Sequence, residues 1–405
     1  MTKRLLKILD KVTIGSSRSL GWEVLITGLS FPASILLNRI LGSEQRGLLA
    51  LVILLPSTIF ALGSCQWDRL LTGLITSKQI SSKEAWRRTT YYVYYLSFIF
   101  IPLGIVASLA LDKLPQDDRL ISILYYVNFP IYFLNGCLHS IYIASGNLDS
   151  QYLMRMALQG SYLLLIFGLF FANLLGVKSL VLVYISIHTI SLGIGLIQKN
   201  KSLTGITLKE RPAISLLKKG FFPYLLESIA GNIDTWSLSI FCSLVSLGQY
   251  TAITSIMVPV GLVSNAMTNS STANLDWTQP ILVRRYLIKV VIVLLCLLLM
   301  LVIGGVLLGP YLLNLVLGKS FEEGKWMIPW IAAIAISQAT ANQFHSALQL
   351  SGYFNRYLMI QTIEPFVRLI IVLTLGYCLS ELGIMIGLTA SYVLKIIVCS
   401  YFQRR

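Results

Sequence analysis

The sequence predicts an all-α polytopic membrane protein. Of its 405 residues, 56% are hydrophobic and only 12% are charged, whereas a soluble protein usually carries about 25% charged residues. Apolar runs of about 20 residues recur along the chain, and each is long enough to cross a bilayer as a helix. A membrane β-barrel would instead show alternating runs of about 10 residues.

Twelve spans are predicted, with both termini on the cytoplasmic side. They cover residues 19–41, 47–67, 91–111, 120–145, 153–176, 179–198, 220–245, 249–274, 286–309, 326–351, 357–380 and 382–402. With this count, 23 of the 32 Lys and Arg residues fall on cytoplasmic segments and six on outer ones, as the positive-inside rule requires. The net charge of +15 therefore indicates orientation and contact with anionic membrane lipids rather than binding of nucleic acid. The basic segment 68–90 is expected to lie along the membrane surface.

A weak internal repeat divides the chain into two halves. Three dipeptides recur at one offset of 206 residues, namely Leu41-Gly42 with Leu247-Gly248, His139-Ser140 with His345-Ser346, and Ser145-Gly146 with Ser351-Gly352. We expect a six-helix lobe over 1–198, a basic cytoplasmic linker over 199–219 and a second six-helix lobe over 220–405. Because six is even, both halves have the same orientation, and a cleft is expected between them near the midplane.

The stretch 220–246 carries acids inside an apolar run. Glu227 and Asp234 are seven residues apart, so a continuous helix would place them on one face, with Asn232 on the neighbouring polar stripe. A carboxylate at mid-bilayer costs about 2.5–3.5 kcal/mol, and both are therefore expected to face protein or water. We interpret this helix as the lining of a cavity.

Polar residues in other spans extend the list of cavity candidates. They are Glu23, Asn38 and Arg39 in the first span, Asn135 and His139 in the fourth, Asn342 and His345 in the tenth, and Arg368 in the eleventh. A structural alternative stays open for most of them, since polar side chains in membrane helices often only link neighbouring helices. Glu364 and Arg368 have the spacing of a helical ion pair, and Lys395 is expected to extend toward the inner face.

Sequence signatures of enzymes are missing. The chain carries no zincin helix, nucleophile elbow or phosphate-binding glycine loop, and its three histidines fall in three separate spans. We therefore expect neither an enzyme nor a cofactor or metal site. A proton or a sodium ion bound at an acidic cavity residue is the coupling ion that we consider.

Three segments resemble the polysaccharide transporter family, the Wzx-type flippases of the multidrug/oligosaccharidyl-lipid/polysaccharide exporter superfamily. They are LLNRILGSEQRGLLALVILLP (36–56), IDTWSLSIFCSLVSLGQYTAITSI (233–256) and LVLGKSFEEGKWMIPWIAAIA (315–335). The resemblance implies a MATE-like fold, with two six-helix lobes forming a V around a central cavity. It also implies that Asp234 occupies the family's acidic position. The family's cationic cavity residues have no clear counterpart, although Arg18, Arg39 and Arg368 are available cations.

The resemblance further implies that the chain flips a polyprenyl-diphosphate-linked oligosaccharide across the bacterial cytoplasmic membrane by alternating access. Such a flippase would serve the synthesis of O-antigen, capsule or exopolysaccharide, and a polysaccharide polymerase and glycosyltransferases would be its partners. The first alternative is a proton- or sodium-coupled small-molecule or drug antiporter of the same superfamily. A membrane glycan polymerase or ligase is less favoured, because such enzymes usually have a large outer loop.

Overall fold

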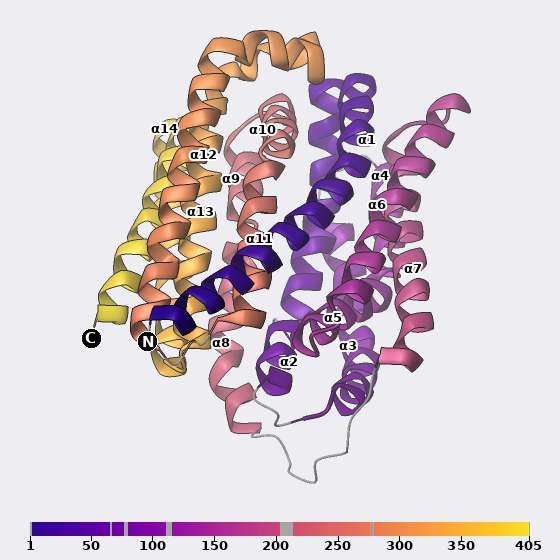
Figure 1. Cartoon of the computed structure of the whole chain (residues 1–405). Coiled ribbons are helices and arrows are strands. Elements are labelled where there is room, and N and C mark those ends of the chain that lie inside the picture. Colours follow the sequence, from indigo (N-terminus) through magenta and orange to yellow (C-terminus); the bar gives the residue numbers. More distant parts are fainter. Residues whose placement is uncertain are drawn as a thin grey trace. The chain divides into compact units, whose positions relative to one another are not determined.

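The computed structural model is helical almost throughout the part of the chain that it describes (Figure 1). The described residues are 2–64, 67–76, 80–110, 116–202, 214–275, 277 and 279–404. In chain order the helices are α1 (Thr2–Ser64), α2 (Trp67–Thr76), α3 (Ser82–Ala110), α4 (Gln116–Tyr126), α5 (Phe129–Ala144), α6 (Leu148–Phe171), α7 (Val177–Ser202), α8 (Ile214–Ala230), α9 (Ile233–Phe241), α10 (Leu244–Ile256), α11 (Val258–Asn274), α12 (Pro280–Val316), the 3₁₀ helix η1 (Lys319–Trp326), α13 (Met327–Leu350) and α14 (Phe354–Arg404). The predicted all-α class is confirmed.

Two of these helices contain a sharp internal change of direction. The backbone leaves the helical region at Gly42 in α1, with φ 69° and ψ 180°, and at Ser380 in α14, with φ 51° and ψ −130°. Glycine tolerates a positive φ without steric cost. Both positions fall where the sequence predicted one span to end and the next to begin.

Three predicted spans are each built from two shorter helices. The span 220–245 breaks at the Gly231–Asn232 turn between α8 and α9. The span 120–145 consists of α4 and α5, and the span 249–274 consists mainly of α10 and α11. In α5 and α11 a proline occupies the first turn, Pro130 and Pro259 respectively. Proline fits this position because the first amides of a helix have no intrahelical partner. The new helix therefore starts just before each proline.

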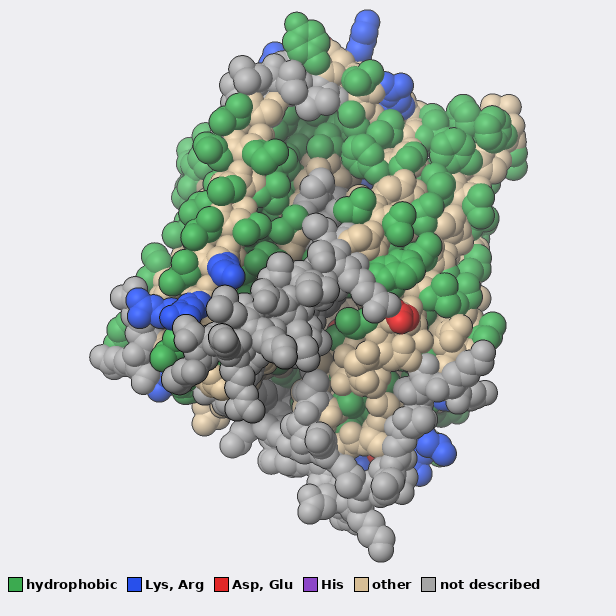
Figure 2. Space-filling view, in the orientation of Figure 1, with side chains coloured by type: hydrophobic (Ala, Val, Ile, Leu, Met, Phe, Trp, Pro, Cys, Tyr) green, Lys and Arg blue, Asp and Glu red, His purple; other side chains and the backbone are tan. Residues whose placement is uncertain are grey.

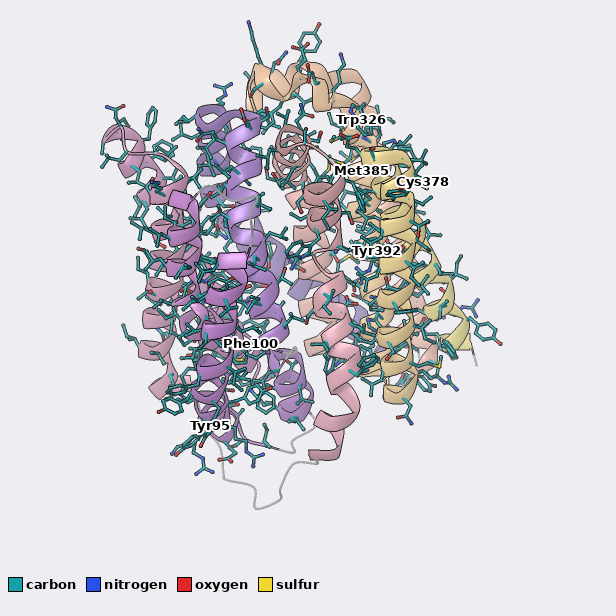
Figure 3. All side chains as sticks on the ribbon, turned by 180° about the vertical axis from the view of Figure 1, so that it is seen from behind. Tyr95, Phe100, Trp326, Cys378, Met385 and Tyr392 are labelled. Atoms are coloured by element: carbon teal, nitrogen blue, oxygen red, sulfur yellow. The ribbon has the colours of Figure 1, made fainter. Side chains whose placement is uncertain are left out.

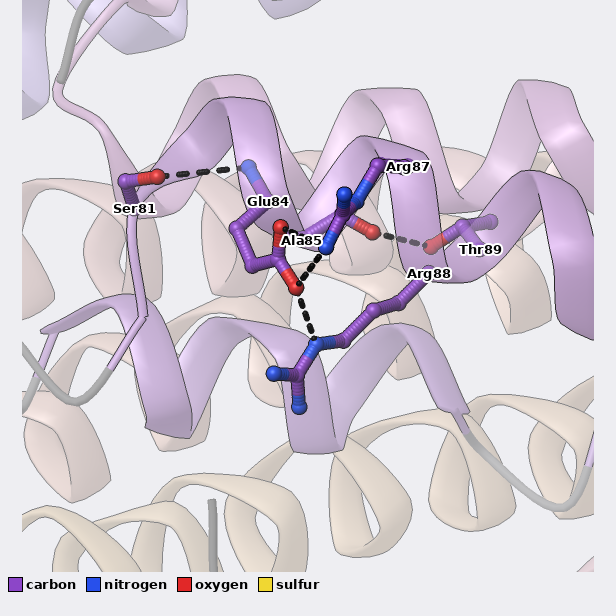
Figure 4. Close-up of polar contacts among 6 residues, drawn as sticks. All are labelled: Ser81, Glu84, Ala85, Arg87, Arg88 and Thr89. Carbon is purple, nitrogen blue, oxygen red and sulfur yellow. Dashed lines mark hydrogen bonds and ion pairs between the residues drawn. The ribbon is translucent and has the colours of Figure 1, made fainter. Parts of the chain in front are cut away.

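The start of α3 is fixed by a cap and by ion pairs (Figure 4). The Ser81 hydroxyl accepts a hydrogen bond of 3.2 Å from the backbone N–H of Glu84, which is half of a Ser-x-x-Glu capping box. The Glu84 carboxylate lies 2.9 Å from the Arg87 guanidinium and 2.7 Å from that of Arg88. As a result α3 begins nine residues before the span predicted at 91–111.

Helix α2, in the segment 68–90 that is expected along the membrane surface, packs one face against the protein. Its residues Leu70, Leu71, Leu74 and Ile75 are all buried, and the helix packs mainly against α5. The Trp67 indole donates a hydrogen bond of 3.0 Å to the Thr89 hydroxyl. An apolar face at helical spacing explains the burial, and the placement of 68–90 at the membrane surface stays a prediction.

The internal repeat has a backbone counterpart at its third dipeptide. Gly146 ends the turn after α5 with φ 76°, and Gly352 ends the turn after α13 with φ 83°. The N–H of the next residue then donates to the carbonyl of the residue five positions earlier, over 2.9 Å in the first turn and 3.0 Å in the second. Both turns have the hydrogen-bond pattern of a Schellman cap. The repeated Ser-Gly therefore encodes one helix–turn–helix twice.

Internal contacts divide the chain into two compact units. The C-terminal unit comprises Met1–Thr27, Asn38–Gly47 and Ile233–Arg405, and the N-terminal unit comprises Gly28–Leu37 and Leu48–Asn232. Much of the predicted linker at 199–219 lies outside the described residues. The lobe boundaries derived from the repeat stay a prediction.

Five helical stretches are long and apolar enough to cross a membrane, within the part of the chain described here. They are Gly21–Ser64, Ser82–Val106, Leu148–Phe171, Val177–Lys199 and Asn355–Gln403. Figure 2 shows hydrophobic side chains over the shafts of the helices and Lys and Arg mainly near their ends. This distribution suits a multi-pass membrane protein. The count of twelve crossings stays a prediction.

Candidate functional site

Asp234 is held at the start of α9 by three hydrogen bonds. One carboxylate oxygen accepts from the backbone N–H of Thr235 at 2.7 Å and from its hydroxyl at 3.2 Å. The other accepts from the Tyr250 hydroxyl at 2.7 Å. An anion in the first turn of a helix is also stabilised by the helix dipole. The half-buried Asp234 carboxylate therefore has a defined orientation.

Glu227 does not share a continuous helix with Asp234. The turn at Gly231–Asn232 ends α8 and belongs to neither helix, so the seven-residue spacing no longer implies a common face. Within the N-terminal unit, the Asn232 amide donates a long hydrogen bond of 3.5 Å to the Thr58 hydroxyl. Glu227 itself is half-buried. The argument that placed both acids on one face is wrong because the helix breaks between them.

We expect the Tyr250 hydroxyl and the Asp234 carboxylate to be energetically coupled. Hydrogen bonds to charged groups contribute about 1.5–3 kcal/mol. Tyr250→Phe should therefore destabilise the wild-type protein more than it destabilises Asp234→Asn, with a coupling free energy of about 1 kcal/mol or more in a double-mutant cycle. Thermal unfolding of the four proteins would measure it, and additive effects would show that this hydrogen bond contributes little.

A buried ionic cluster joins the two segments of α14, and we call it the α14 cluster. It consists of Glu364, Arg368, Tyr392 and Lys395. The Glu364 carboxylate lies 3.1 Å from the Arg368 Nε and 3.1 Å from the Lys395 Nζ. The Arg368 guanidinium also donates to the Tyr392 hydroxyl at 3.0 Å. Figure 3 shows Tyr392 about midway along the C-terminal segment of α14.

The α14 cluster is almost completely removed from solvent. The side chains of Arg368, Lys395 and Glu364 are 2%, 1% and 6% exposed. The predicted Glu364–Arg368 pair is confirmed, but the expectation that Lys395 extends toward the inner face is wrong, because its ammonium pairs with Glu364. Sequence reasoning therefore missed a member of the cluster. The sequence did contain an indication of this member, because a lysine inside the last apolar span is rare unless its charge has a role.

The polar face of α14 continues beyond the ionic cluster. Tyr357, Gln361, Glu364 and Arg368 follow one another at spacings of four, three and four, which places them on one helical face. The His345 ring stacks on Tyr357 with centroids 4.3 Å apart. Gln361 is 0% exposed, and neither atom of its amide has a hydrogen-bond partner among the described residues. The face thus combines charged groups with a buried amide that is not hydrogen-bonded.

A second polar cluster lies in the N-terminal unit. The Asn135 amide contacts the Nδ1 of His188 at 3.3 Å and accepts a hydrogen bond of 3.1 Å from the Ser191 hydroxyl. The Tyr132 and His188 rings pack edge to face at 4.9 Å. His139, which follows Asn135 by one turn, is half-buried, and no described residue is a hydrogen-bond partner of its Nδ1. Asn135 thus meets His188, to which the sequence assigned no role.

The remaining predicted site residues differ in their burial and contacts. Glu23 and Asn38 are completely buried, and both amide atoms of Asn38 lack a hydrogen-bond partner within the described ranges. Arg39 is exposed and donates to the backbone carbonyl of Leu315. Asn342 is exposed. A cavity role for these residues stays a prediction.

Solved structures of MATE transporters have a similar fold, although no family model and no curated protein matches the sequence. A mutant of the Vibrio cholerae MATE transporter VcmN has a TM-score of 0.67 at 14% identity, covering 99% of this chain and 98% of that chain. The inward-facing multidrug resistance MATE transporter of the MOP superfamily has a TM-score of 0.62 at 15% identity, covering 94% of each chain. The MATE multidrug transporter DinF-BH has a TM-score of 0.63 at 13% identity, covering 98% of this chain and 95% of that chain. The chain therefore has the MATE fold.

Proposed function

We propose that this all-α membrane protein with the MATE fold is a transporter that flips a polyprenyl-diphosphate-linked oligosaccharide from the inner to the outer leaflet. The observation that supports an anionic cargo is the α14 cluster, in which two cations surround one carboxylate. A diphosphate group is attracted by such a surplus of positive charge, whereas a cationic drug is repelled by it. In a low-dielectric interior both effects are much larger than in water.

The fold supports the transport step. Similar structures include one MATE transporter in an inward-facing and one in an outward-facing conformation. We propose that this chain likewise alternates between two such states, with the head group inside the protein and the isoprenoid chain in lipid. A proton or sodium ion bound at Asp234 would bias the two states by its different affinity for each.

The N-terminal polar cluster suits the oligosaccharide part of the cargo. Asn135, His188 and Ser191 supply amide, imidazole and hydroxyl groups, which are the usual partners of sugar hydroxyls. The Tyr132 ring beside them is 42% exposed, and an aromatic face with a few convergent polar groups is typical of a small-ligand site. We propose that this cluster binds sugar, with the surrounding membrane lipids, a polymerase and glycosyltransferases as the other partners of the process.

Neutralising both acids should stop glycan export without loss of protein. We expect the Asp234→Asn/Glu227→Gln variant to reduce surface polysaccharide at least about tenfold, because coupling is lost when no carboxylate can take up the ion, and each factor of ten corresponds to about 1.4 kcal/mol. Surface glycan in a strain that lacks the chromosomal gene would be the measurement. Glu322→Gln, at an exposed position, is the matched control. Normal glycan in the double variant would contradict the proposal.

A small-molecule antiporter is the second candidate, since three of the similar structures are described as multidrug transporters. Expression in a drug-sensitive strain that also lacks the chromosomal gene, and therefore its surface glycan, separates the two functions. An antiporter raises the inhibitory concentration of cationic drugs and leaves surface glycan unchanged. The proposed flippase restores glycan and leaves drug sensitivity unchanged.

A further inference from the structure

Gln361 is the feature of the α14 face that the protein's own hydrogen bonds leave unexplained. Its side chain is fully buried, yet neither its amide nitrogen nor its amide oxygen has a hydrogen-bond partner in the part of the chain that the structure describes. Buried polar groups are nearly always hydrogen-bonded, and each exception requires a reason such as a bound ion, water or functional role. A ligand that binds and is released during the transport cycle would be such a reason.

The residues around Gln361 indicate which kind of ligand would bind there. Glu364 lies one turn along the same helical face and Arg368 two turns along it, and Lys395 contacts Glu364 from the other segment of α14. An amide NH₂, a guanidinium and an ammonium are all hydrogen-bond donors. A set of donors with two positive charges matches the oxygens of a phosphate group.

A single water molecule would fit Gln361 less well. Water can hydrogen-bond the amide and the two cationic groups, but it carries no negative charge to balance them. The two cations already share the Glu364 carboxylate, with both distances at 3.1 Å. A phosphate presents several anionic oxygens, so it can take the place of that carboxylate and reach the Gln361 amide as well.

We propose that Gln361, Arg368 and Lys395 form a phosphate-binding site, in which one phosphate of the cargo exchanges with Glu364 as the partner of the two cations. This inference rests on the proposed function and deepens it, because it names where the diphosphate is recognised. Glu364 then holds the cations in place while the site is empty. Its release on binding couples cargo recognition to the contact between the two segments of α14.

Pyrophosphate binding to the purified full-length protein tests the site. The thermal unfolding midpoint is measured in detergent against increasing inorganic pyrophosphate at constant ionic strength, with sulfate as the comparison anion, and the dissociation constant follows from the shift. Gln361→Met keeps the size of the side chain but removes its amide, and Gln338→Met is the control at an exposed position of α13. Lys395→Met removes one cation, and Lys289→Met is its exposed control.

We expect Gln361→Met to weaken pyrophosphate binding at least fivefold while leaving the midpoint without pyrophosphate unchanged or higher. Lys395→Met should weaken binding at least tenfold, and both control variants should stay within twofold of the wild type. If Lys395→Met does not fold, Gln361→Met decides alone. Wild-type affinity in Gln361→Met, or a wild-type response no larger than that to sulfate, would overturn the phosphate site.

Translocation in liposomes separates this inference from the proposed function. A wild-type protein that flips a diphosphate-linked glycan, with pyrophosphate affinity unchanged in Gln361→Met, would overturn the site and leave the function standing. A protein that binds pyrophosphate through Gln361 but flips no such lipid would support the site and overturn the function. Failure of the phosphate site and failure of the proposed function therefore give different experimental results.

Discussion

Gly248→Ala is expected to prevent normal folding of the C-terminal unit. A Cβ atom at Gly248 would lie 1.7 Å from the backbone carbonyl oxygen of Ser43, far inside van der Waals contact. Both sides of this contact are backbone, so no side-chain rotation relieves it. Overpacking of this kind costs about 3 kcal/mol or more, a large share of the roughly 5–15 kcal/mol by which proteins are stable. Thermal unfolding and the monodisperse fraction in size-exclusion chromatography would measure the loss.

Alanine substitutions at two further glycines test whether the loss of stability comes from the close backbone contact. Gly47→Ala should behave like Gly248→Ala, because its Cβ would lie 1.9 Å from the Leu244 carbonyl oxygen. Gly261→Ala is the matched control, since an added Cβ there meets nothing within 4 Å, and alanine is favoured over glycine in a helix by about 1 kcal/mol. A Gly248→Ala protein as stable as the wild type would show that the two segments do not approach so closely.

The repeated Leu-Gly dipeptide serves a different purpose in each half. At Gly42 the glycine takes a positive φ of 69°, which turns the chain between two helical segments. At Gly248, which is helical, the glycine lets another backbone come into contact. Small residues permit such close helix crossings in membranes. The sequence offset revealed the repeat, but only tertiary packing distinguishes these two requirements.

Apolar run length predicted where helices lie and that the chain turns near Gly42 and Ser380, but not the breaks inside a predicted span. The same pattern of hydrophobic residues fits a continuous helix, a kinked helix and two helices in succession, and a proline suits the start of a new helix as well as a kink. Gly231 therefore gave no decisive signal, although it separates Glu227 from Asp234. The backbone of the Ser-Gly turns was predictable because it is local, with hydrogen bonds that span only five residues.

The candidate site was predictable only where its contacts are local. Glu364 and Arg368 are four residues apart, so helical spacing alone predicted their ion pair. Lys395 joins them from the other segment of α14, and Tyr250 reaches Asp234 from α10. Neither contact follows from periodicity, because each depends on how two helices pack. Helical spacing places Gln361 on the face of Glu364, but its lack of hydrogen-bond partners among the described residues is a property of the folded chain alone.

Glu364→Ala should be among the most damaging substitutions in the protein. It leaves Arg368 and Lys395, which are 2% and 1% exposed, without their shared carboxylate. Removing one partner of a buried ion pair costs about 3–5 kcal/mol, because the remaining charge stays desolvated. We expect a correspondingly large fall in the thermal unfolding midpoint. Glu84→Ala is the matched control, since Glu84 also pairs with two arginines but Arg87 is 70% exposed, and exposed pairs contribute about 0–1 kcal/mol.

Replacing the three charged residues of the α14 cluster distinguishes a structural role from a functional one. A variant with Glu364→Leu, Arg368→Met and Lys395→Met contains no buried charge at this position, and such replacements are often neutral or stabilising by about 1–4 kcal/mol. We therefore expect the triple variant to regain most of the stability that Glu364→Ala loses. If the cluster exists to bind cargo, the stable triple variant will still fail to export glycan. A triple variant that is both stable and active would mean that these charges serve neither folding nor transport.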